Sequence, residues 1–268
     1  MVFFTNFPSP KLLYNLPKID SITRSSRNNM KQKEKIIETF SEMAPRYEEI
    51  VNHELTRFWG LSYQEFITAL IDSSPIQKDA IILDIATGTG MIPIRLINNT
   101  GNHKTIHGLD ITHSMLIQAN RNFRKNNHQE IVKLTCASAM EMPYSSMSFD
   151  YVFCGLATHH MNVKLLTNEV YRILRLGGQI SFADVGSTQL WKYPGVKWII
   201  RLLAFVYYLT KEGANRAWAE SSAVSNVLTA EEWFSVLSDL NFKKISIKKM
   251  KSKYIWIPSP LVIRAEKF

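Results

Sequence analysis

A glycine-rich turn and two acidic residues are the side chains whose types and spacing best fit a ligand site. The turn ends the segment LDIATGTG, residues 83–90, which begins in a short run of apolar, β-branched residues. Gly88 and Gly90 let the chain bend sharply after a buried strand and approach a ligand without a Cβ atom. Asp110 comes 20 residues after Gly90, where a carboxylate can accept hydrogen bonds from ribose hydroxyls. These features predict a pocket for a nucleoside-bearing cofactor.

The residues around the turn also distinguish between cofactors. The dinucleotide fingerprint G-x-G-x-x-G needs a third glycine for close packing of helix on strand, and Pro93 occupies that position. The phosphate-binding motif G-x-x-x-x-G-K-[ST] does not occur in the sequence. Asp84, at the end of the predicted strand, would repel phosphate groups but suits a ligand with an ammonium or sulfonium group. The sequence therefore favours S-adenosylmethionine over NAD.

Strands and helices that alternate along the chain would position these residues. A strand over 81–86 precedes a helical pattern that contains Ile92, Ile94, Leu96 and Ile97. The same order recurs with strands at 105–109, 150–154 and 179–184, followed by helical segments at 114–126, 162–174 and 196–209. This alternation predicts an α/β fold, a doubly wound (Rossmann-like) sheet with parallel strands.

The two ends of the chain depart from this alternation. Residues 31–53 have apolar side chains at helical spacing, with a break expected where Pro45 disfavours helix at Ala44. Thr229 opens a capping-box pattern for a helix through about Leu240. Two strands follow without a long helix between them, which predicts an antiparallel C-terminal hairpin.

The predicted organisation is one core domain with additions. We expect a mobile extension over 1–30, a helical cap over 31–75 and the core over 76–268, with a helical lid inserted at about 187–228. No second folding domain is required.

Five ordered motifs resemble the class I S-adenosylmethionine-dependent methyltransferases, over about residues 31–268. The motifs are LDIATGTG (83–90), GLDITHSML (108–116), ASAMEMPY (137–144), SFDYV (148–152) and LRLGG (174–178). The resemblance implies a seven-stranded mixed sheet. It also implies a set of cofactor-binding residues: Asp84, Ala86, Thr87, Gly88, Gly90, Asp110, Ile111, Met115, Ser138 and Ala139.

The resemblance assigns roles within this set. The loop over 83–90 would hold the methionine end of the cofactor, Asp110 the ribose, and Met115 would pack on adenine. Ser138 stands where many relatives have an aspartate that binds the adenine amino group, so adenine contacts would come partly from backbone or from the serine hydroxyl.

The similarity is greatest to the C-methyltransferases of ubiquinone and menaquinone biosynthesis. Segments 40–47 and 57–59 are similar to the N-terminal helical region of that type, whereas 183–187 departs from its pattern.

Two adjacent histidines are the candidates for a general base. His159 and His160 follow the strand expected at 150–154, and a histidine suits deprotonation near neutral pH. We slightly prefer His160, with Asp184 at the end of the next strand as a further acceptor-site residue. The alternative is that the histidines cap a helix or pack against the cofactor loop, and that Asp184 is structural. The seven histidines form no HExxH or Cys/His pattern, so no metal site is expected.

The segment from Trp191 to Trp218 bears on the acceptor. Residues 196–209 are almost continuously apolar but are interrupted by Lys197 and Arg201, which leaves them short of a membrane-spanning run. Burial against protein, a channel for a greasy substrate and a membrane-resting face all remain open.

We therefore expect methylation, on carbon or oxygen, of a small lipophilic acceptor that is aromatic or quinone-like. The alternatives are a methyltransferase of nucleic acid or protein, and a cofactor-binding regulator without turnover.

The net charge of +9 is concentrated in two places. Residues 1–35 hold seven basic and two acidic residues, and 243–253 hold six lysines and no acid, so the remainder has 19 basic and 21 acidic residues. A nucleic-acid partner is therefore not expected. The two basic segments could contact an anionic membrane or simply be solvated.

Localisation and assembly are less constrained by the sequence. Cys136 and Cys154 are expected to be buried thiols in a cytoplasmic protein, and an organellar transit peptide is the minor alternative. The sequence does not indicate an oligomeric state.

Overall fold

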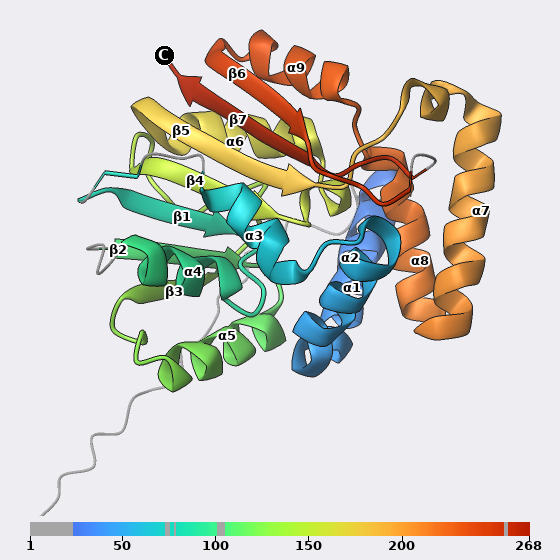
Figure 1. Ribbon diagram of the computed structural model, residues 1–268, viewed down its shortest axis with the longest axis horizontal. Helices are drawn as coiled ribbons and strands as arrows, with labels where there is room; N and C mark the ends of the chain where they lie inside the picture. Colours follow the sequence, from blue (N-terminus) through green and yellow to red (C-terminus); the bar gives the residue numbers. More distant parts are fainter. Residues whose placement is uncertain (1–23, 73–75, 78, 101–104, 255–256) are drawn as a thin grey trace, which may run out of the picture. The chain divides into compact units, whose positions relative to one another are not determined.

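Figure 1 shows the fold as a computed structural model, which describes residues 24–72, 76–77, 79–100, 105–254 and 257–268. Two compact units divide the chain, one over 1–34 and the other over 35–268. The expected extension over 1–30 lies outside the described residues up to position 23, and residues 24–30 are helical. The division into extension, cap and core stays a prediction.

A single seven-stranded sheet forms the centre of the second unit, with the order β3-β2-β1-β4-β5-β7-β6. Strands β1 to β5 pair in parallel, and β7 is antiparallel to both β5 and β6. The strands are β1 (Ile81–Ile85), β2 (Thr105–Asp110), β3 (Val132–Cys136), β4 (Phe149–Gly155), β5 (Leu174–Asp184), β6 (Phe242–Lys249) and β7 (Leu261–Lys267). The predicted mixed α/β sheet with its antiparallel C-terminal hairpin is confirmed.

Alternating side chains of the strands build a separate core on each face of this sheet. In β1, Leu83 and Ile85 join the core that contains Trp233, whereas Ile82 joins the core that contains Phe66 and Phe123. The helices of the first core are α6 (Val163–Ile173) and α9 (Ala230–Asp239). Those of the second are α2 (Tyr47–Trp59), α3 (Tyr63–Ile71), α4 (Met91–Thr100) and α5 (His113–Lys125). Apolar residues on both faces are typical of parallel strands covered by helices.

The sequence signals at two helix boundaries are confirmed. Thr229 caps α9 with a capping box, in which its side chain accepts from Glu232 N and its own N–H donates to the Glu232 carboxylate. At Pro45, helix α1 (Arg24–Met43) gives way to a 3₁₀ turn, and α2 (Tyr47–Trp59) begins directly after it.

The lid contains two helices where the apolar pattern predicted one. Helix α7 (Pro194–Lys211) ends before Gly213, whose φ of +94° reverses the chain into α8 (Ala214–Ala223). Helix α7 has no buried residue, although its apolar composition favoured burial against protein. The two helices pack on each other, so α7 contacts the unit from one side only.

Cys136 is exposed, and the expectation that both cysteines are buried is wrong for this residue. It ends β3, which is an edge strand of the sheet. Cys154, in central strand β4, is buried as expected. In the described part of the chain, no helix has the length and apolar character needed to cross a bilayer; a cytoplasmic location stays a prediction.

Candidate active site

The loop after β1 brings the two predicted acids together. Gly88 N donates to Asp110 Oδ2 over 2.9 Å, and Thr112 N donates to Asp110 Oδ1 over 2.8 Å. On the same loop, Thr87 Oγ1 donates to Asp84 Oδ2 over 2.6 Å. Because β1 and β2 are parallel neighbours, their carboxyl ends meet at one edge of the sheet, where an open α/β sheet binds its ligand.

Backbone conformation explains why glycine is needed in this loop. Gly88 and Gly90 have φ angles of +54° and +83°, a region that costs other residues about 1–2 kcal/mol. A Cβ atom at Gly90 would lie 2.5 Å from the ring of Phe123. Gly90 therefore allows the start of α4 to pack closely on α5. Gly88 is different, because a Cβ atom there would lie 3.8 Å from the ring of Tyr47, an ordinary contact distance.

The electrostatics of the loop fit a cationic ligand. The pKa of Asp84 is raised to about 8. Burial is the main cause, the hydrogen bond from Thr87 partly opposes it, and the charge of Asp110 adds to it. Oδ1 of Asp84 is buried and has no hydrogen-bond partner among the described residues. A buried carboxyl group with an unused acceptor is stabilised by a positive group placed against it. The ammonium and sulfonium groups of S-adenosylmethionine meet this requirement.

The remaining predicted cofactor residues lie at the same edge. Ala86, with a φ of +51°, begins the loop itself. Ile111 and Met115 follow β2, and Met115 is buried. Ser138 and Ala139 follow β3, where Ser138 Oγ accepts from Met140 N over 3.3 Å. The structure thus gathers all ten residues at the ends of three adjacent parallel strands, and their individual roles stay predictions.

His159 and Asp184 form a hydrogen-bonded pair at the ends of β4 and β5. The distance from His159 Nδ1 to Asp184 Oδ1 is 2.6 Å. Asp184 also accepts from the backbone N–H groups of His159 and Val185 and from the hydroxyl of Thr158. Both partners are largely buried, so the carboxylate fixes the orientation of the imidazole and leaves Nε2 for another partner.

Opposite effects set the pKa values within this pair. Burial lowers the pKa of His159, but the charge and hydrogen bond of Asp184 outweigh burial and leave it raised. Burial raises the pKa of Asp184, but the charge and hydrogen bond of His159, with the Thr158 and Val185 bonds, leave it lowered. Each partner therefore stabilises the charged form of the other.

His160 lies in a different environment. Its Nε2 is 3.5 Å from Glu220 Oε1, and its ring packs edge-on against Phe40 with 5.1 Å between centroids. Burial and the neighbouring charge of His159 lower its pKa, although Glu220 opposes both effects. The two histidines are therefore not equivalent: a carboxylate at the end of β5 orients the ring of His159, whereas the partner of His160 lies on the lid. The slight preference for His160 as the base stays a prediction.

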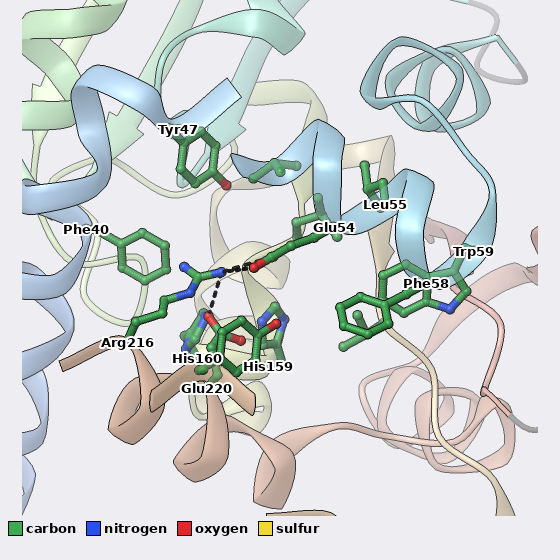
Figure 2. Close-up of a pocket in the computed structure, with 14 residues that line it drawn as sticks. Phe40, Tyr47, Glu54, Leu55, Phe58, Trp59, His159, His160, Arg216 and Glu220 are labelled. Carbon is green, nitrogen blue, oxygen red and sulfur yellow. Dashed lines mark hydrogen bonds and ion pairs between the residues drawn. The ribbon is translucent and has the colours of Figure 1, made fainter. Parts of the chain in front are cut away.

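A buried arginine on the lid completes the site and was not predicted. Figure 2 shows Arg216 of α8 between Glu54 of α2 and Glu220, with Nη2 3.1 Å from a carboxylate oxygen of each. Burial raises the pKa of Glu54 to about 7 despite the opposing charge of Arg216. Burial also acts on Glu220, but Arg216 and both histidines hold its pKa well below the usual range. The sequence signal for this cluster was the i,i+4 spacing of Arg216 and Glu220 on one helix.

These groups line one pocket with largely aromatic walls. Its empty space, with the open mouth and adjoining solvent included, is about 490 Å³. The polar residues are Glu54, His159, His160, Arg216 and Glu220; the apolar and aromatic ones are Phe40, Tyr47, Val51, Leu55, Phe58, Trp59, Leu156, Val185 and Tyr208. Tyr47 belongs both to this pocket and to the surroundings of Gly88, so the pocket adjoins the cofactor loop.

A metal ion does not suit this cluster, although His159, His160 and Glu220 offer ligand atoms within 4.8 Å of one another. The guanidinium group of Arg216 already contacts Glu220, and its positive charge would repel a divalent cation bound to the same carboxylate.

Fold and site together define a class. A seven-stranded sheet with one antiparallel strand inserted near its end, a glycine-rich loop after β1 and an acid after β2 are the features of class I S-adenosylmethionine-dependent methyltransferases. Residues 82–178 match the family model described as a methyltransferase domain. This chain belongs to that class of enzyme, whose methyl donor is S-adenosylmethionine.

Individual relatives are more distant. The chain is 24% identical over 201 residues to demethylmenaquinone methyltransferase of Listeria welshimeri, a match that covers 71% of this chain and 80% of that protein. It is 25% identical over 164 residues to the enzyme of the same name from Lactobacillus johnsonii, a match that covers 61% of this chain and 66% of that protein. Geranyl diphosphate C-methyltransferase of Streptomyces coelicolor shares the fold, with a TM-score of 0.61, 16% identity and 83% of each chain covered.

Proposed function

We propose that this enzyme methylates a small lipophilic acceptor with an aromatic or quinone-like ring. The observation that carries the proposal is the aromatic pocket beside the cofactor loop, which His159 lines while its ring is held by Asp184. Aromatic walls favour a flat apolar ring, and the few polar groups would orient it. The names of the demethylmenaquinone methyltransferases support the same kind of acceptor.

The proposed chemistry needs only one proton acceptor from the protein. S-adenosylmethionine supplies an activated methyl group, so orientation of the acceptor provides much of the acceleration. His159, in its neutral form, takes the acceptor's proton at Nε2, from a hydroxyl for transfer to oxygen or from a ring carbon for transfer to carbon. Asp184 holds the Nδ1–H and stabilises the imidazolium that results.

Arg216 would act as a positioning residue. Its guanidinium group lies 5.3 Å from the ring centroid of Tyr208 and 5.8 Å from that of Phe40. It also links α2 to α8 through Glu54 and Glu220. By joining two walls of the pocket, it would keep the aromatic side chains at a fixed spacing around the acceptor.

The test is incubation with labelled S-adenosylmethionine and a demethylated quinol, with mass identification of the product. His159→Gln should lower kcat by about 10²–10⁴ and leave the affinity for S-adenosylhomocysteine unchanged. His160→Gln, the matched control beside it, should have a much smaller effect on kcat. Asp184→Asn should move the acidic limb of the pH–rate profile to lower pH, because it removes the charge that raises the pKa of His159.

Three outcomes would contradict the proposal. Label found only in RNA, DNA or protein would indicate a macromolecular acceptor. Cofactor binding without turnover on any lipid-soluble extract would indicate a regulator. Equal kcat for wild type and His159→Gln would remove His159 as the base.

A further inference from the structure

The outer face of α7 has the densest group of exposed apolar side chains in the described part of the chain. Six of them are 44% to 64% exposed, and each is one or three residues from the next along the helix: Trp198, Ile199, Leu202, Leu203, Val206 and Leu209. We call this set the α7 stripe. Just before the helix, Leu190 and Tyr193 are exposed as well. Apolar residues at this spacing lie on one side of a helix, and a contiguous exposed patch marks an interaction surface.

The charged side chains of residues 185–211, which include the α7 stripe, are all positive. Residues 185–211 contain no aspartate or glutamate. Lys192 before the helix, Arg201 within it and Lys211 at its end are exposed. An apolar face bordered by cations matches the interface of an anionic lipid bilayer, which accepts apolar side chains and attracts lysine and arginine.

The same charges disfavour a second copy of this chain on the α7 stripe. A two-fold symmetric contact places the same patch of both copies face to face. Arg201 lies beside the centre of the stripe, next to Leu202, so such a contact would bring two Arg201 side chains close together without an acid on the helix to neutralise them.

The inner face of α7 belongs to the acceptor pocket. Tyr208 lines the pocket, and Tyr207 packs edge-on against Phe58, another lining residue, with 5.4 Å between ring centroids. Figure 1 shows α8 on the side of α7 that faces the sheet, with no other labelled helix over the opposite side. One helix thus separates the pocket from the surface that carries the α7 stripe.

We propose that the α7 stripe docks on an anionic membrane surface, with its apolar side chains in the interface and Arg201, Lys192 and Lys211 on lipid headgroups. The helix lies along the surface and does not cross the bilayer, in keeping with its interrupted apolar sequence. The six lysines at 243–253 are not needed: Lys244 already pairs with Glu266 on the neighbouring strand. The docking goes beyond the proposed function and does not depend on the identity of the acceptor.

The experiment is sedimentation of the full chain with vesicles. One set consists of phosphatidylcholine alone, and the other contains about one third phosphatidylglycerol. The apolar variant carries Trp198→Ser, Leu202→Ser and Val206→Ser. Its matched control carries three serines at exposed apolar positions elsewhere, Leu165→Ser, Leu176→Ser and Phe234→Ser. The charge variant carries Arg201→Gln and Lys211→Gln. Calorimetric binding of S-adenosylhomocysteine to each variant confirms that it is folded.

The wild type and the matched control should bind anionic vesicles equally. The apolar variant should bind at least about tenfold more weakly, because it loses three side chains that enter the interface. The charge variant should bind anionic vesicles about 25-fold more weakly, since each of its two lost basic residues contributes about fivefold near the surface. Its binding to neutral vesicles should change little.

Three outcomes would overturn the proposal. Equal partitioning of wild type and apolar variant would assign any membrane binding to another part of the chain. No binding of the wild type to either vesicle would exclude a lipid surface. A dimer that dissociates in the apolar variant, without vesicle binding, would assign the α7 stripe to a second copy of the chain.

Discussion

Binding of S-adenosylmethionine at pH 6.5 should release close to one proton from Asp84. Burial, opposed by the Thr87 hydrogen bond and reinforced by the charge of Asp110, raises the pKa of this carboxyl group to about 8. At pH 6.5 the group is then protonated in about 97% of the molecules, by the ordinary titration relation. A cationic ligand against the unpartnered Oδ1 favours the ionised form, so the proton leaves when the ligand binds.

The same argument gives the pH dependence of the affinity. Only the ionised form attracts the cation, so the apparent affinity is reduced by the fraction of molecules that are ionised beforehand. The affinity should rise about tenfold between pH 6 and pH 7 and level off above pH 8. At pH 6.5 the amino group of the ligand is itself charged, because α-amino groups titrate near 8, so it adds little to the proton count.

Isothermal titration calorimetry in buffers of different ionisation enthalpy measures the number of protons released. Asp84→Asn should bind more weakly and release almost none. An affinity that does not change between pH 6 and pH 7, with no dependence on the buffer, would refute the reasoning. Proton release that survives in Asp84→Asn would also refute it, since the proton would come from another group such as Asp110.

Three further predictions concern stability and can be measured by urea unfolding. Gly90→Ala should lower the free energy of unfolding by about 2–5 kcal/mol, because its backbone is left-handed and the new Cβ clashes with the ring of Phe123. Gly177→Ala, at a φ of +74° with nothing within 4 Å, should lower it by only about 1–2 kcal/mol. Equal losses in the two variants would contradict the packing argument. Arg216→Met should lower the free energy of unfolding by about 3–5 kcal/mol at pH 8 and by less at pH 5.5. At the lower pH Glu54, with a pKa of about 7, is largely protonated and no longer needs a counter-charge. A loss of stability that grows as the pH falls would contradict this reasoning. Thr229→Ala should cost about 1 kcal/mol through loss of the cap, and Thr229→Ser should restore most of it.

The cofactor half of the site could be predicted because its signals are local. The turn at 83–90 and Asp110 are each attached to the end of a buried strand. In a parallel sheet, neighbouring strand ends meet whatever the helices between them look like. Sequence spacing was therefore sufficient to place these acids together.

The acceptor half could not be predicted in the same way. Glu54 and Arg216 are 162 residues apart and contact each other only because the lid folds over α2. The i,i+4 spacing of Arg216 and Glu220 is the local signal in the sequence, but the same spacing is common on exposed helix faces. The exposure of α7 could not be predicted either, because the sequence of an apolar helix has the same pattern whether protein, substrate or lipid covers it.

The two histidines show why topology, and not residue type, decides the candidate base. His159 and His160 are neighbours with the same chemistry, and the 3₁₀ turn over Thr158–His160 points them at different partners. His159 reaches Asp184 because β4 and β5 pair in parallel, which brings the turn after β4 beside the end of β5. His160 reaches Glu220 only through the lid. Asn226 of the lid also donates to the backbone carbonyl of His159, but the partner of the His159 ring stays on β5 if the lid moves to admit an acceptor, whereas the ring of His160 would lose its partner. This difference is the structural reason to assign proton transfer to His159.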